Sequence, residues 1–186
     1  MFDKQYRFRG SHAEKVNKLT AYFCSASKAK VFERNLDVYI NAPLIGFLYG
    51  KRADLDEKKN PDTGQVFNEN IMGEQVIHAS EELIFNFRLI MLLDDEYEPN
   101  EDARVDKAFR NMGDNKSDEE RFDSYVRGGV DVLYEKLIEE ASGPEEIIER
   151  LYTFLDDFND RFNSAVSCAE LISLCGKSFI EDVDNV

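Results

Sequence analysis

Apolar residues recur every three to four positions through most of the chain, which is the spacing of one face of an α-helix. The pattern predicts helices over residues 11–23, 35–49, 71–93, 105–112, 117–141 and 144–162, and a last short helix from about residue 167 that carries Cys168, Leu171, Ile172 and Cys175. Strand-like alternation is confined to residues 2–9, so we expect an extended arm over residues 1–10. The predicted fold is mainly α, a single-domain helical bundle of about six to seven helices with a short extended N-terminal arm.

Two predicted helices begin with the pattern of a capping box. Ser11 precedes Glu14 by three positions, and Ser117 precedes Glu120 by the same spacing. In such a box the serine hydroxyl accepts a hydrogen bond from the backbone N–H three residues on, and the glutamate accepts one from the serine N–H. We therefore expect helices to start at Ser11 and Ser117.

Residues 35–49 are apolar on nearly all sides, which predicts a central, buried helix. Pro43 removes a backbone donor within it, so we expect a kink or a split near Asn41 and Ala42. Gly128 and Gly129 lie inside another predicted helix, where close packing of a neighbouring helix is the favoured reason. Polar stretches separate the helices: an exposed loop over residues 51–65 and an acidic linker over residues 94–102.

Composition narrows the class of protein. A length of 186 residues fits one domain that can bury a core without disulfides or metals. No apolar run approaches the roughly 18 residues of a spanning helix, and the first residues lack an apolar signal region, so we expect a cytoplasmic protein without membrane interaction. The three cysteines show no C-x-x-C spacing and are predicted to be reduced thiols.

Charge is distributed unevenly along the chain. The net charge is −15, yet residues 1–90 carry 13 basic and 12 acidic residues, while residues 91–186 carry 10 basic and 26 acidic ones. Residues 1–34 alone have a net charge of +5. This distribution excludes a nucleic-acid footprint over the whole surface and leaves a local one open.

Candidate catalytic and metal-binding residues are few. The only histidines are His12 and His78. Glu74, His78 and Glu82 are spaced four residues apart on one predicted helix, so they could ligate a metal or form a solvated helix face. Glu81, Glu82, Asp94, Asp95 and Glu96 supply further carboxylates, for which we expect a solvated acidic surface. The chain lacks a phosphate-binding glycine loop and a nucleophile motif. We predict no catalytic residue, no metal site and no cofactor.

The N-terminal segment interleaves cations with aromatic residues, a composition that can contact nucleic acid. The candidate contacts are Lys4, Arg7, Arg9, Lys15 and Lys18. The same arm could instead pack Tyr6 and Phe8 on the body, or pair with the acidic half of another copy. The acidic half could also imitate a phosphate backbone. Self-association and nucleic-acid contact therefore both stay open.

Two segments resemble a known family. Within residues 32–52, Asp37-Val38-Tyr39 leads into an apolar helix that ends before Lys51-Arg52. Within residues 119–135, Tyr125 is followed by Gly128-Gly129 and then by an apolar run. Both are similar to small accessory proteins of bacterial DNA phosphorothioation (Dnd) and related phage-restriction systems. The resemblance implies a setting in DNA modification or phage defence and names no catalytic group.

These observations predict a non-enzymatic accessory protein that binds a protein partner and uses its acidic C-terminal half as one recognition surface. The alternative is a nucleic-acid-contacting protein that uses the basic segment over residues 4–34.

Overall fold

The computed structural model describes residues 1–162, which form seven α-helices, one π-helical turn and a two-stranded sheet. The prediction of a mainly helical fold with an extended N-terminal arm is confirmed. The elements are β1 (Tyr6–Arg9), α1 (Gly10–Thr20), α2 (Asn35–Leu48), β2 (Asn68–Ile71), α3 (Gly73–His78), α4 (Ser80–Leu93), α5 (Glu101–Val105), the π-helical turn η1 (Asp106–Arg110), α6 (Lys116–Leu137) and α7 (Pro144–Phe162). The predicted helix from residue 167, with Cys168 and Cys175, lies outside the described residues.

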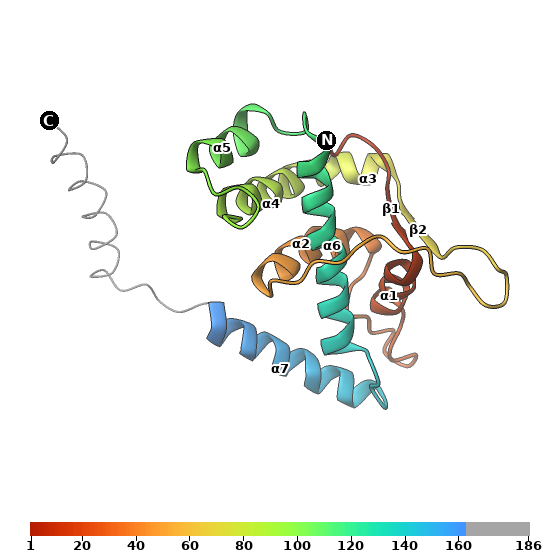
Figure 1. Cartoon of the computed structure of the whole chain (residues 1–186). Helices are drawn as coiled ribbons and strands as arrows, with labels where there is room; N and C mark the ends of the chain where they lie inside the picture. Colours follow the sequence, from red (N-terminus) through yellow and green to blue (C-terminus); the bar gives the residue numbers. More distant parts are fainter. Residues whose placement is uncertain (163–186) are drawn as a thin grey trace, which may run out of the picture. The chain divides into compact units, whose positions relative to one another are not determined.

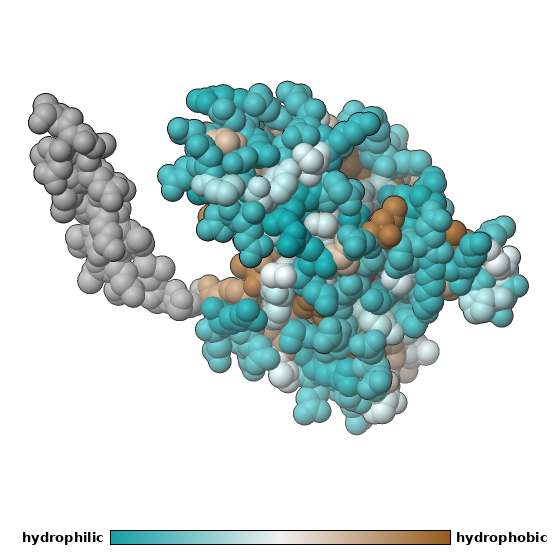
Figure 2. All heavy atoms as spheres, in the orientation of Figure 1, coloured by the Kyte–Doolittle hydropathy of each residue, from teal (hydrophilic) through white to brown (hydrophobic). Residues whose placement is uncertain are grey.

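Contacts between residues divide the chain into two compact units, Met1–Ile147 and Ile148–Val186. The first unit holds both strands and every helix up to the first turn of α7 (Figure 1). On the face of this unit shown in Figure 2 the surface is mostly hydrophilic, and apolar residues appear only in small, separate areas. No helix in residues 1–162 is long and apolar enough to cross a membrane.

The centre of the first unit is the crossing of α2 and α6 (Figure 1). A Cβ atom added at Gly129 would overlap the carbonyl oxygen of Ala42, and one added at Gly46 would overlap the carbonyl oxygen of Tyr125. At Gly128 it would overlap the carbonyl oxygen of Lys51, just beyond α2. The expectation that the paired glycines admit a neighbouring helix is confirmed.

The small sheet joins distant parts of the sequence. β1 pairs antiparallel with β2, with Tyr6 opposite Ile71 and Phe8 opposite Glu69. Strand-like alternation is found only in the N-terminal arm, and β2, with the sequence Asn-Glu-Asn-Ile, is a second strand that this pattern does not indicate. That sequence has no apolar alternation, so its pairing depends on a partner more than sixty residues away.

Of the kink or split expected near Asn41 and Ala42, the split is wrong, because α2 is continuous from Asn35 to Leu48 with Pro43 inside it, and the kink stays a prediction. A proline weakens hydrogen bonding in the preceding helical turn, because it has no N–H and crowds the carbonyl four residues before it. In that turn the carbonyl oxygen of Ile40 accepts a hydrogen bond of 2.7 Å from the Asn86 side chain of α4. Asn86, which is 4% exposed, thus joins α4 to α2 beside the turn that the proline disturbs, whereas the carbonyl that loses its helical donor is that of Tyr39, four residues before Pro43.

Replacing Asn86 with alanine is expected to destabilise the first unit by about 1 kcal/mol, since it removes a hydrogen bond between a buried side chain of α4 and the backbone of α2. Urea unfolding followed by far-UV circular dichroism measures the change. Asn41→Ala is the matched control, because Asn41 is exposed and, within residues 1–162, its amide donates only to the carbonyl of Asp37 in its own helix. Equal midpoints for the two variants would contradict the role given to Asn86.

Both predicted capping boxes are wrong. α1 begins at Gly10, and the N–H and hydroxyl of Ser11 both donate to the carboxylate of Asp56. α6 begins at Lys116, and the Asn115 side chain accepts from the N–H of Ser117. In each case a better acceptor lies nearby, which converts the serine from acceptor to donor.

The remaining boundaries differ only slightly from expectation. The helix predicted over residues 71–93 is interrupted at Ala79 (φ −97°, ψ 14°), which separates α3 from α4. The acidic stretch predicted as a linker over 94–102 ends earlier, because α5 begins at Glu101 with Asn100 as its cap. Residues 51–65 contain no helix, but a bridge joins Lys59 to Val66 and Asp56 is half-buried.

Candidate functional site

Part of the acidic half is internal. Asp94 is 3% exposed, and its carboxylate accepts from Arg121 at 2.6 and 2.8 Å and from the Tyr125 hydroxyl at 2.9 Å. Burial and the hydrogen bond to Asp94 raise the pKa of Tyr125 above its ordinary value. A solvated surface was expected for Asp94, and this expectation is wrong. The carboxylate instead joins the start of the 94–100 segment to α6.

A second buried carboxylate, Asp118, lies on α6 itself, one turn before Arg121. Asp118 is 2% exposed and accepts from the Tyr97 hydroxyl at 2.6 Å and from Lys107 at 3.0 Å. The two buried carboxylates are therefore fully engaged in holding elements together. They are unavailable to a partner.

The five predicted nucleic-acid contacts lie on β1, the residues before it, and α1. Four of them have partners: Arg7 donates to Asn70 at 2.9 Å, Arg9 pairs with Glu57 at 3.2 Å, Lys15 with Asp131 at 2.7 Å and Lys18 with Glu14 at 3.2 Å. Lys4 is exposed and makes no ion pair with any described residue. Nucleic-acid contact by these residues stays a prediction.

The histidines differ in their surroundings. Glu74, His78 and Glu82 are all exposed, and within residues 1–162 no three His, Cys, Asp or Glu side chains are grouped as metal ligands. His12 is 3% exposed, with its Nε2 atom 3.4 Å from Asp131 and its Nδ1 atom 3.8 Å from Asp56. Burial alone would raise the pKa of Asp131, but hydrogen bonds from His12 and Lys15 outweigh it and lower that pKa.

Ser11, His12 and the two nearby aspartates do not form a catalytic triad. The Ser11 hydroxyl donates to Asp56, and no hydrogen bond in the described part of the chain joins it to the His12 ring. A serine nucleophile needs a base within hydrogen-bond reach of its hydroxyl. His12 therefore holds α1 to α6 through Asp131.

The first open site is a concave surface between α2 and α4, which we call the α2/α4 groove. It encloses about 380 Å³ and is lined by Ile40, Asn41, Leu44, Glu81, Glu82, Phe85 and Asn86. Phe85 is 62% exposed although it is a large aromatic residue. Glu81 and Glu82 are exposed at the edge and form no ion pair with any described residue. The groove thus combines an apolar floor with a carboxylate rim.

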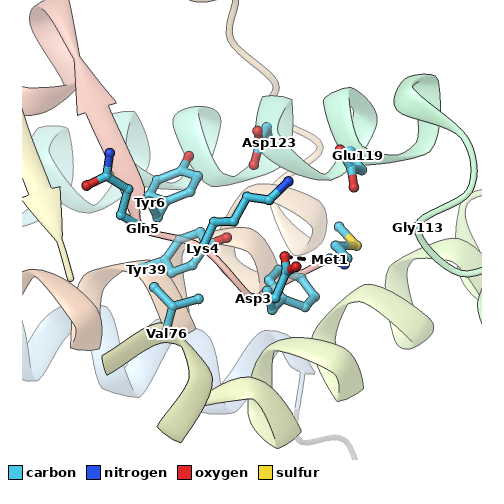
Figure 3. Close-up of a pocket in the computed structure, with 11 residues that line it drawn as sticks. Met1, Asp3, Lys4, Gln5, Tyr6, Tyr39, Val76, Gly113, Glu119 and Asp123 are labelled. Atoms are coloured by element: carbon cyan, nitrogen blue, oxygen red, sulfur yellow. Dashed lines mark ion pairs between the residues drawn. The ribbon is translucent and has the colours of Figure 1, made fainter. Parts of the chain in front are cut away.

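The second open site lies between the N-terminal arm and α6 and encloses about 300 Å³. We call it the tyrosine–carboxylate hollow, after Tyr6, Tyr39, Glu119 and Asp123 (Figure 3). The rings of Tyr6 and Tyr39 are stacked with their centroids 3.9 Å apart. Burial raises the pKa of Asp123 from 3.8 to about 7, although Arg127 acts in the opposite direction.

Neither site was assigned from the sequence, but one signal was present. Glu119, Asp123, Arg127 and Asp131 recur every four residues beside the apolar face of α6, so charged groups border a buried stripe. The residues that face these charged groups come from the N-terminal arm and from the loop before β2. The spacing along α6 does not predict where those two segments pack.

Comparison with known proteins adds no relative: no family model, curated protein or solved structure matches the chain. The fold and the two open sites therefore carry the functional argument alone.

Proposed function

We propose that this chain is a protein-interaction component that binds a basic, amphipathic helix of a partner protein in the α2/α4 groove. The observation that carries the proposal is the exposed Phe85 at a concave apolar surface, together with two carboxylates, Glu81 and Glu82, that have no ion-pair partner within residues 1–162. Aromatic residues of this kind dominate binding energy where they fill a pocket or receive an anchor.

The chemistry of the groove selects its occupant. An amphipathic helix presents apolar residues at i, i+3, i+4 and i+7, a spacing that suits a groove between two helices. Glu81 and Glu82 lie on the first turn of α4, where lysines or arginines flanking that apolar face would meet them. A basic helix is therefore favoured over an acidic or neutral one. The proposal keeps DNA modification or phage defence as the setting of the partner, which the sequence resemblance implies.

The test uses a fluorescent synthetic helix with leucines at i, i+3, i+4 and i+7 and lysines elsewhere, and a peptide of the same composition in scrambled order. Anisotropy titration should show binding of the first peptide only. Phe85→Ala is expected to weaken that binding about tenfold, which corresponds to 1.4 kcal/mol. The matched control is Phe109→Ala, since Phe109 is 53% exposed on η1 and does not line the groove.

Equal binding of both peptides, or an unchanged affinity in Phe85→Ala, would refute the groove as the recognition site. Duplex DNA binding that falls steeply with salt and disappears in the Arg7→Ala, Arg9→Ala double variant would favour the nucleic-acid alternative. Affinity capture with wild type and Phe85→Ala in parallel, both treated with nuclease, then identifies native partners as proteins that only the wild type retains.

A further inference from the structure

We infer that the tyrosine–carboxylate hollow is a binding site for a primary ammonium group, supplied by a small amine or by a lysine side chain of another protein. This site is separate from the α2/α4 groove, and the inference does not depend on the proposed function.

The hollow presents unsatisfied acceptors. Glu119 and Asp123 lie one turn apart on α6 and project into the hollow (Figure 3). Neither carboxylate forms a hydrogen bond or an ion pair with any residue in 1–162, whereas the buried carboxylates of Asp94 and Asp118 are fully paired. Both side chains are half-buried and border a cavity, so their carboxylate oxygens are free to accept hydrogen bonds from a cationic donor that enters it.

The tyrosines give an independent indication. Tyr39 is only 3% exposed, yet its hydroxyl has no hydrogen-bond partner among the described residues. Burial, then the charges of Asp123 and Glu119, raise its pKa well above the ordinary value, so Tyr39 lines the same cavity as both carboxylates with a neutral hydroxyl. The stacked Tyr6 and Tyr39 rings add an electron-rich wall. Aromatic rings beside carboxylates favour an ammonium ligand over a neutral or anionic one.

The chain itself places an ammonium group at this position. Figure 3 shows the Lys4 side chain reaching across the hollow toward α6, where Glu119 and Asp123 project. Lys4 still forms no ion pair within the described part of the chain, so the carboxylates are left available. Asp3, the other acid of the arm that lines the hollow, lies 3.8 Å from the amino group of Met1. Lys4 is therefore expected to compete with a ligand and to weaken its binding.

Binding should depend on pH through Asp123, whose pKa of about 7 lies above that of an ordinary aspartate. A cation prefers the ionised carboxylate, so affinity should rise from pH 6 to pH 8 by about tenfold, as the ionised fraction increases. Asp123 borders two cavities, the hollow and a second one beside β1. The titratable and charged groups that line them with it are the amino group of Met1 and the side chains of Asp3, Lys4, Tyr6, Arg7, Arg9, His12, Tyr39, Glu119, Glu120 and Arg127.

The experiment titrates Nα-acetyl-lysine amide, its Nε-acetylated form and 1,4-diaminobutane into the full-length protein, followed by amide NMR shifts and calorimetry. Nα-acetyl-lysine amide should bind and its Nε-acetylated form should not. Asp123→Asn should lower the affinity at pH 8 about tenfold and remove the pH dependence, and Lys4→Ala should raise the affinity. Glu135→Gln is the control, because Glu135 is an exposed carboxylate on the same helix. It should change neither the affinity at pH 8 nor the pH dependence.

Tighter binding of the diamine would support a small-molecule ligand, and tighter binding of the lysine derivative would support a side chain of another protein. The inference is overturned if Nε-acetylation leaves binding unchanged, or if Asp123→Asn behaves like Glu135→Gln. Lys4→Ala keeps the test decisive should Asp123→Asn perturb folding, because an exposed lysine is replaced. An unchanged affinity in Lys4→Ala would also count against the site.

Discussion

Replacing Gly129 with alanine is expected to destabilise the first unit by about 3 kcal/mol, although the same change inside most helices stabilises by about 0.5–1 kcal/mol. The sign reverses because the added methyl group would overlap the backbone of α2 at Ala42. A backbone oxygen cannot rotate away as a flexible side chain can, so the two helices must move apart. Urea unfolding followed by far-UV circular dichroism measures the loss.

Gly143→Ala is the control for this prediction. A Cβ atom at Gly143 meets nothing within 4 Å, so its cost should stay below about 1 kcal/mol. If Gly129→Ala is as stable as the wild type, α2 and α6 do not approach each other this closely. The difference in stability between Gly129→Ala and Gly143→Ala therefore reports how closely α2 and α6 approach each other.

The second large effect is expected at Asp94. Asp94→Ala removes the carboxylate that pairs with Arg121 and leaves a guanidinium, only 10% exposed, without its main partner. Breaking one side of a buried ion pair costs about 3–5 kcal/mol, since the remaining charge stays desolvated. We expect a loss of this size in urea unfolding, together with loosening of the segment that follows α4.

Two further variants test whether the loss of stability in Asp94→Ala comes from the burial of the ion pair or from the loss of an ion pair as such. Asp106→Ala breaks an ion pair with Arg110, which is 72% exposed, and should cost at most about 1 kcal/mol. Asp94→Leu combined with Arg121→Met should recover most of the stability, because no uncompensated charge remains. A small effect of Asp94→Ala alone would show that Arg121 reaches water.

Much of the helical structure follows from local spacing. The predicted segments 35–49 and 144–162 lie within one residue of α2 and α7, and the start predicted at Ser117 is one residue from that of α6. Gly128 and Gly129 correctly indicated a close neighbour. In these segments the apolar period and the local capping or packing residues agree, so tertiary contacts do not change the outcome.

Several of the failures share one physical cause. β2, the acceptor of Ser11 and the donor beside Pro43 all depend on residues far away in the sequence, Tyr6–Arg9, Asp56 and Asn86 respectively. Asp94 appeared solvated because its neighbours are acidic, yet Arg121 reaches it from α6. The two open sites are harder still to predict from the sequence, because each is lined by residues from elements that lie far apart along the chain.

The position of α6 in the sequence also affects how the protein is made. α2 is complete at Leu48, but the helix that covers it ends at Leu137. At about 5–20 residues per second, the roughly 90 residues between those points take about 4–18 s to synthesise. Throughout that interval the face of α2 that packs on α6 stays uncovered in the growing chain, and chaperones can bind this apolar surface. The nascent polypeptide on the ribosome, rather than the finished molecule, is therefore the form most exposed to aggregation.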